Sequence, residues 1–121
     1  MFIGMNREIA VKVKEINIER GNPTAETAVR NMVSGLHTAK GAGYKAVILV
    51  HGYGSSGVGG TIKNAARAML NSRALSGIVR DFTGGENWFA RKREFTDLCR
   101  QLKDYNSHID NNKGITVILL K

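Results

Sequence analysis

A short apolar run at residues 45–50 leads into the glycine-rich segment 51–61, and this junction constrains the fold more than any other feature of the chain. The run is rich in β-branched side chains, which predicts a buried β-strand. Apolar residues with helical spacing follow at 62–70 and predict an amphipathic helix. The first turn of a helix offers unpaired N–H groups and the positive end of its dipole to an anion. We therefore expect the binding or active site at this loop, with His51 where the strand ends.

The residues expected to hold a phosphate or a nucleic acid come from this segment, from the helix that follows it and from an earlier turn. They are Gly52, Tyr53, Gly54, Ser55, Ser56, Gly57, Gly59, Gly60, Thr61, Lys63, Arg67 and Arg20. Two roles are open for the Tyr53 ring: it either stacks on a nucleobase or packs across the loop.

The rest of the chain alternates between strand and helix patterns. Alternating apolar residues predict a strand at 8–18, and a change of their parity near residues 14–15 predicts a bulge there. Thr24 is the expected N-cap of a helix that ends at the glycines 41–43. A short strand at 78–82, a loop at 83–87, a helix that opens at Trp88 and an apolar strand at 114–120 complete the order. One apolar face of that last helix is expected to hold Phe95, Leu98, Cys99, Leu102 and Tyr105.

This order of elements predicts one α/β domain over residues 1–121, with a flexible N-terminus at 1–7 and a helical insert at 83–112. Right-handed βαβ units place consecutive strands parallel, so we expect a compact two-layer or three-layer βαβαβ(α)β sandwich with a mostly parallel four-stranded sheet. The direction of the last strand stays open. Ligands of such folds bind beyond the carboxyl ends of the strands, which would gather the loop at 51–61 and the turns at 19–24 and 83–87.

The charge balance indicates the class of partner. The chain has 18 Lys and Arg against 10 Asp and Glu, a formal net charge of +8. Such an excess favours a polyanion, most often a nucleic acid, although small domains also carry charge for solubility. No apolar run approaches the about 20 residues that span a membrane, and the start lacks the core of a signal peptide. We therefore expect a cytoplasmic domain without a membrane partner, monomeric, in which the single cysteine, Cys99, is a buried thiol.

Two phosphate-binding motifs partly match the loop. Gly52, Gly54 and Gly57 have the spacing of the dinucleotide fingerprint, and Asp81 stands where a ribose-binding acid would be expected. The fingerprint helix should begin before Thr61, however, so nucleotide binding is the lesser alternative. The frame of a P-loop is also present, but Gly60 occupies the position at which that motif requires lysine.

The segment His51-Gly52-Tyr53-Gly54, between an apolar strand and an amphipathic helix, resembles the core motif of the Smr (small MutS-related) domain family. The segment Gly114-Ile115-Thr116-Val117 is similar to the closing Gly-x-Thr-Val strand of that family. The resemblance covers about two-thirds of the chain. It implies a nucleic-acid-binding α/β domain, similar to the C-terminal domain of bacterial initiation factor three, with DNA or RNA nicking activity in some members.

The chain departs from this family at the first motif, Leu-Asp-x-His-Gly. Asn17 occupies the position of the aspartate, and Glu19 stands nearest that of the histidine. Two functions therefore remain open. In the first, the domain only binds RNA or structured DNA. In the second, it is a nicking endonuclease with His51 as general acid or base and Glu19 as the substitute acid, and only then would Mg²⁺ or Mn²⁺ be required. No residue is predicted as a ligand of a resident metal.

A second basic and aromatic cluster follows the loop at 83–87. It comprises Trp88, Phe89 and the run Arg91-Lys92-Arg93. This cluster has two interpretations. Either it is a further contact for nucleic acid, or the two aromatic residues pack into the core and the three basic residues are exposed to solvent.

Overall fold

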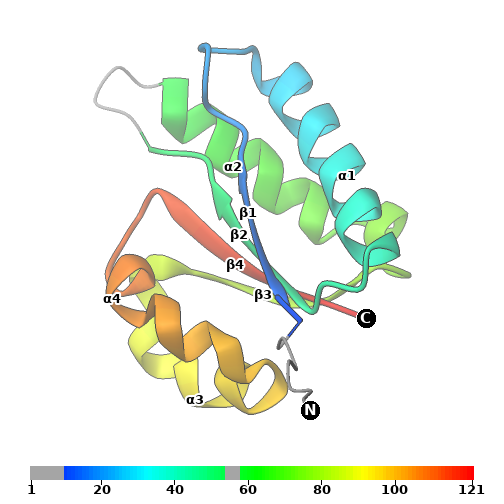
Figure 1. Cartoon of the computed structure of the whole chain (residues 1–121). Coiled ribbons are helices and arrows are strands. Elements are labelled where there is room, and N and C mark those ends of the chain that lie inside the picture. Colours follow the sequence, from blue (N-terminus) through cyan, green and yellow to red (C-terminus); the bar gives the residue numbers. More distant parts are fainter. Residues whose placement is uncertain (1–9, 54–57) are drawn as a thin grey trace, which may run out of the picture.

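A computed structural model describes residues 10–53 and 58–121 (Figure 1). The predicted N-terminal tail at 1–7 and the start of the first predicted strand lie outside this part. The elements are β1 (Val13–Asn17), α1 (Ala25–Gly41), β2 (Ala46–Val50), α2 (Val58–Leu70), η1 (Arg73–Leu75), β3 (Val79–Gly84), η2 (Gly85–Asn87), α3 (Trp88–Leu98), η3 (Arg100–Tyr105), α4 (Asn106–Ile109) and β4 (Ile115–Leu120). The α/β class is confirmed, and the helices cover both faces of the sheet, so the arrangement has three layers.

The four strands form one mixed sheet in the order β1-β2-β4-β3. Only β1 and β2 pair in parallel, whereas β4 runs antiparallel to both of its neighbours. The predicted mostly parallel sheet was therefore wrong. The reason is the long connection before β4, which returns to the end of the sheet that it left: the Asn111 amide donates to the Gly85 carbonyl, and the Gly114 carbonyl accepts from His51 and Gly52. From that edge, β4 can only run back between β2 and β3.

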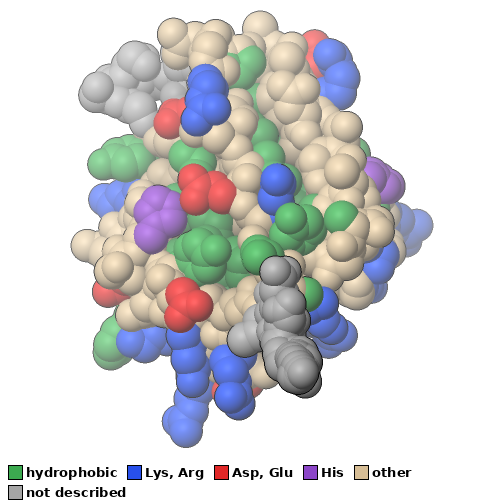
Figure 2. All heavy atoms as spheres, in the orientation of Figure 1, with side chains coloured by type: hydrophobic (Ala, Val, Ile, Leu, Met, Phe, Trp, Pro, Cys, Tyr) green, Lys and Arg blue, Asp and Glu red, His purple; other side chains and the backbone are tan. Residues whose placement is uncertain are grey.

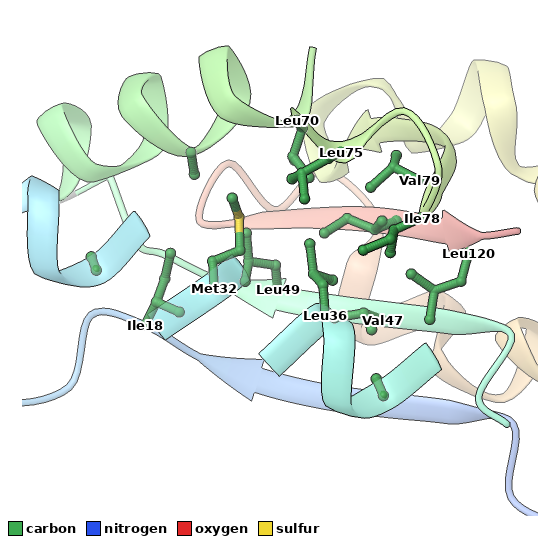
Figure 3. Packing of buried hydrophobic residues seen from close by; sticks show 14 of the residues in the cluster. Ile18, Met32, Leu36, Val47, Leu49, Leu70, Leu75, Ile78, Val79 and Leu120 are labelled. Carbon is green, nitrogen blue, oxygen red and sulfur yellow. The ribbon is translucent and has the colours of Figure 1, made fainter. Parts of the chain in front are cut away.

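The upper layer packs α1 and α2 against one face of the sheet. Thr24 caps α1 as predicted, since its hydroxyl accepts from the Thr27 amide at 3.1 Å. Figure 3 shows side chains from the helices, from η1 and from the strands pointing into the same apolar layer. The residues labelled there are Ile18, Met32, Leu36, Val47, Leu49, Leu70, Leu75, Ile78, Val79 and Leu120. All of them are buried.

The lower layer is built from the segment between β3 and β4. Trp88 is fully buried; its ring meets Phe95 edge-on at 5.9 Å between centroids, and its indole N–H donates to Asn106 at 2.7 Å. The predicted single helix through Tyr105 was wrong, because α3 stops before Cys99, whose backbone is extended. This break turns the chain, so Leu98 is 51% exposed instead of joining the apolar face.

The predicted bulge in the first strand was also wrong, because the pairing of β1 with β2 runs without a shift from Val13 to Asn17. The change of parity has a different cause. β1 is covered on both faces, so Val13 packs into the lower layer while Ile16 and Ile18 pack into the upper one. Apolar residues on both parities are what a strand between two helical layers requires.

Gly85 lies where the chain leaves β3, and its substitution tests this connection. A side-chain carbon there would overlap the carbonyl oxygen of Asn112 and come within 2.6 Å of that of Ile109. These neighbours are backbone atoms, and a shift of the backbone is energetically costly. Gly85→Ala should therefore lower the free energy of unfolding by at least about 2 kcal/mol. Gly41→Ala is the control, because nothing lies within 4 Å of the new carbon at the end of α1, and there the free energy should stay constant or rise by up to about 1 kcal/mol. Urea unfolding measures the free energy of unfolding of both variants. An equal change in Gly85→Ala and Gly41→Ala would contradict the close approach of the carbonyl groups to Gly85.

Candidate functional site

The carboxyl ends of β1, β2 and β3 lie at one edge of the sheet, because all three strands run in the same direction. The turn after β1 is organised by Asn17, whose side-chain oxygen accepts from the amides of Glu19 and Arg20, at 3.0 Å each. The amide oxygen of Asn17 thus accepts the hydrogen bonds that an aspartate could accept here, but it carries no negative charge. The carboxylate of Glu19 lies directly against Gly52, where a side-chain carbon would overlap it, and the φ of 66° at Gly52 is a second reason for glycine at this position. Arg20 is exposed.

His51 is fully buried at the end of β2, although it was predicted to face a ligand. Its Nδ1 lies 2.7 Å from the carbonyl oxygen of Gly52 and its Nε2 lies 2.8 Å from the hydroxyl of Thr116 on β4. A carbonyl can only accept, so Nδ1 carries the proton and Nε2 accepts from the Thr116 hydroxyl. Both ring nitrogens are therefore engaged in holding the turn. Burial lowers the pKa of His51 to about 4, with Arg67 and Lys63 adding to the effect and the bond to Gly52 opposing it. The imidazole is neutral at pH 7.

A chain of polar contacts continues from His51 to the start of the lower layer. Arg67 Nε donates to the Thr116 hydroxyl at 3.3 Å, and its two terminal nitrogens bind Glu86 at 3.0 and 3.1 Å. Lys63 lies 3.3 Å from the same carboxylate. Burial alone would raise the pKa of Glu86, but the hydrogen bonds from Arg67 and its own backbone, with the charges of Arg67 and Lys63, lower it to about 2. This network ties α2, β4 and η2 to the turn at His51.

Two of the three cations predicted to bind phosphate, Lys63 and Arg67, are thus already ion-paired. The side chains of Lys63 and Arg67 are 15% and 26% exposed, and both share the carboxylate of Glu86. Their combined charge exceeds that of Glu86 by one, so one positive charge remains along the middle and last turn of α2. Glu86 belongs to the loop at 83–87 that was expected at this edge, but neither Glu86 nor Thr116 was named as a binding or catalytic residue. Two sequence signals mark Thr116: its place in the Gly-x-Thr-Val motif, and a polar side chain within an otherwise apolar strand.

A hollow of about 520 Å³ opens beside this network. Its lining comprises Glu19, Val50, Gly52, Tyr53, His108, Asn112, Gly114 and Ile115. Tyr53 is 55% exposed at its wall. The ring of His108, for which no partner was evident from the sequence, lies 3.5 Å from Glu15. The hollow therefore offers an aromatic surface, the carboxylate of Glu19 and a histidine to a ligand.

The glycine-rich segment is only partly described. The predicted contacts Gly54, Ser55, Ser56 and Gly57 lie outside the described residues. α2 begins at Val58, earlier than the sequence indicated, so Gly59, Gly60 and Thr61 belong to its first turns. A side-chain carbon at Gly60 would sit 3.7 Å from the carbonyl of Tyr53. The start of α2 thus lies close to the His51-Gly52-Tyr53 segment.

The nucleotide-binding alternative fits this sheet less well. An open sheet of the doubly wound type places parallel strands on both sides of its ligand, whereas β4 lies antiparallel next to β2 here. The carboxylate of Asp81 is held by Arg91 and accepts from the Phe82 amide at 2.8 Å. Within residues 10–53 and 58–121, no three His, Cys, Asp or Glu side chains gather to hold a metal ion. Over the same residues, no helix has the length and apolar character of a membrane span.

The fold agrees with a solved structure. The crystal structure of the Smr domain of Thermus thermophilus MutS2 matches 89% of this chain and 98% of its own, with a TM-score of 0.57 and 22% identity. The chain therefore has the fold of an Smr domain, as its motifs indicated. No protein-family model matches the chain, and no curated protein shows significant similarity to it.

The buried His51 makes stability depend on pH. Its pKa of about 4 lies below the ordinary 6.5, so the unfolded chain binds more protons between these values and unfolding becomes easier as the pH falls. As the pH falls, the loss in the free energy of unfolding should begin near pH 6.5 and level off near pH 4. It should total about 3 kcal/mol at most. Urea unfolding across this range measures it. His51→Asn is the control, since it keeps His37 and His108 but should lose this part of the slope. Parallel curves for the two proteins would show that His51 does not titrate as described.

Proposed function

We propose that this chain is a nucleic-acid-binding domain that holds RNA or structured DNA at the edge where β1 and β2 end. The observation that carries the proposal is Tyr53, which is 55% exposed beside a hollow of about 520 Å³ and directly follows the buried His51-Gly52 turn. Aromatic rings at such places stack on unpaired bases. The net charge of +8 and the Smr fold, whose family resemblance implies nucleic-acid binding, support the same function.

Each part of the edge has a role in this proposal. His51, fixed by Thr116 and Gly52, holds the turn that presents Tyr53. The first turn of α2 and the glycine-rich loop before it bind a phosphate through backbone N–H groups. Lys63 and Arg67 act through the positive charge that remains after both are paired with Glu86.

Substitution of Tyr53 tests the proposal. Stacking contributes about 1–3 kcal/mol per base, so Tyr53→Ala should weaken binding to single-stranded RNA or DNA by about tenfold or more. Tyr53→Phe keeps the ring and should bind like the wild type. Fluorescence anisotropy with labelled oligonucleotides, beside a blunt duplex of the same sequence, measures both. Equal affinity for Tyr53→Ala and the wild type would contradict a stacking role.

The alternative is a nicking endonuclease, favoured by one observation: Glu19 and His108 line the same hollow as Tyr53. In that alternative, His51 acts as general acid or base, with Mg²⁺ or Mn²⁺ as a possible requirement. His51 would first have to release one of its two hydrogen bonds.

A plasmid assay separates the two functions. A binding domain should leave covalently closed plasmid uncut with Mg²⁺, with Mn²⁺ and with neither. Nicking that is lost in Glu19→Gln and His51→Asn, while both variants still bind DNA, would establish the enzyme instead. Glu19→Gln is the cleaner variant, because it leaves the buried network intact.

A further inference from the structure

A second charged surface lies on the lower layer, away from the glycine-rich loop. Two hollows of about 570 Å³ each flank η3 and share Lys103 in their linings. We call their cations the basic face: Lys12, Lys45, Lys92, Arg93, Arg100 and Lys103. The same linings contain only two carboxylates, those of Asp97 and Asp104. Figure 2 shows Lys and Arg side chains projecting from the lower end of the molecule, below the place of α3 in Figure 1.

These cations differ from those at the loop in having no acidic partner. Lys63 and Arg67 share Glu86, and Arg91 is held by Asp81 and Glu94. By contrast, none of the six cations of the basic face forms an ion pair within the described part of the chain. An excess of four positive charges, half of the formal net charge, is therefore concentrated here.

The basic face lies close to the hollow at Tyr53, because the short helix α4 borders both. Asn106 lines one hollow of the basic face, and His108, two residues later, lines the hollow at Tyr53. Side chains two residues apart point to different sides of a helix, so the two hollows are separated by about the width of α4, roughly 10 Å, or about two nucleotide steps of an extended strand. A strand stacked on Tyr53 can therefore continue past α4 into the basic face.

We propose that the basic face is a second subsite of this domain, which holds backbone phosphates of a single-stranded nucleic acid bound at Tyr53. This inference rests on the function proposed above. The hollows are concave with cations in their walls, a shape that suits a strand better than a flat membrane surface. Phe89, 78% exposed with Lys92 5.2 Å from its ring centroid, adds an aromatic surface beside the phosphate path.

Paired charge removals test the subsite. Arg93→Gln with Lys103→Gln removes two exposed cations of the basic face, and Arg30→Gln with Lys40→Gln removes two exposed cations of α1. Both double variants lose the same net charge. Binding to single-stranded RNA and DNA of about 20 nucleotides, longer than the usual single-strand site, is measured between about 50 and 200 mM salt. The basic-face variant should bind about tenfold more weakly, and its log–log salt slope should be shallower by about 1.4. The α1 variant should stay within about threefold of the wild type.

The outcomes separate the subsite from the proposed function. If the wild type binds neither nucleic acid at low salt, the proposed function fails and the subsite with it. If Tyr53→Ala weakens binding but the basic-face variant does not, or if both charge variants weaken it equally, the subsite alone is overturned. Vesicles of phosphatidylserine and phosphatidylcholine form a parallel arm. Loss of vesicle binding in the basic-face variant, with nucleic-acid binding unchanged, would assign this surface to a membrane instead.

Discussion

The hydrogen bond between His51 and Thr116 is the contact on which the geometry of this edge depends. It joins the end of β2 to the start of β4, and it is buried, so neither group has water as a substitute partner. The Gly52 carbonyl fixes the ring from the other side, and Arg67 connects the same hydroxyl to Glu86. One neutral imidazole thereby connects two strands, the helix α2 through Arg67, and the entry to the lower layer at Glu86.

Local patterns were sufficient for β2 and α1. The strand at 46–50, the Thr24 cap and the helix that follows it agree with the sequence because each depends on residues close in the chain. The direction of β4 could not be predicted, since it follows from the return path of the segment 85–114, which is set by contacts such as that of Asn111 with Gly85. The break at Cys99 is of the same kind: apolar spacing continues through it, and only packing on the sheet reveals the turn.

The meeting of three turns at one edge was predicted from the order of the elements, and the turns after β1, β2 and β3 do lie at one edge of the sheet. The surroundings of His51 were not predicted. Its burial could not be inferred, because the partner that removes the ring from solvent, Thr116, is 65 residues away. Likewise, a net charge of +8 does not indicate where on the surface the charged side chains lie. Glu86 neutralises part of the charge beside the loop, while the six cations of the basic face form no ion pair within the described residues.

The position of β4 also has a consequence for how the chain acquires its structure. β4 separates β2 from β3, and it is the last strand in sequence. Until residues 115–120 have left the ribosome, β2 can pair only with β1, and β3 has no neighbouring strand in the sheet. Pairing at such sequence separation slows folding and leaves apolar strand edges open during synthesis. The sheet therefore cannot be completed until β4 is available, although the elements with the clearest sequence patterns, α1 and β2, are synthesised long before it.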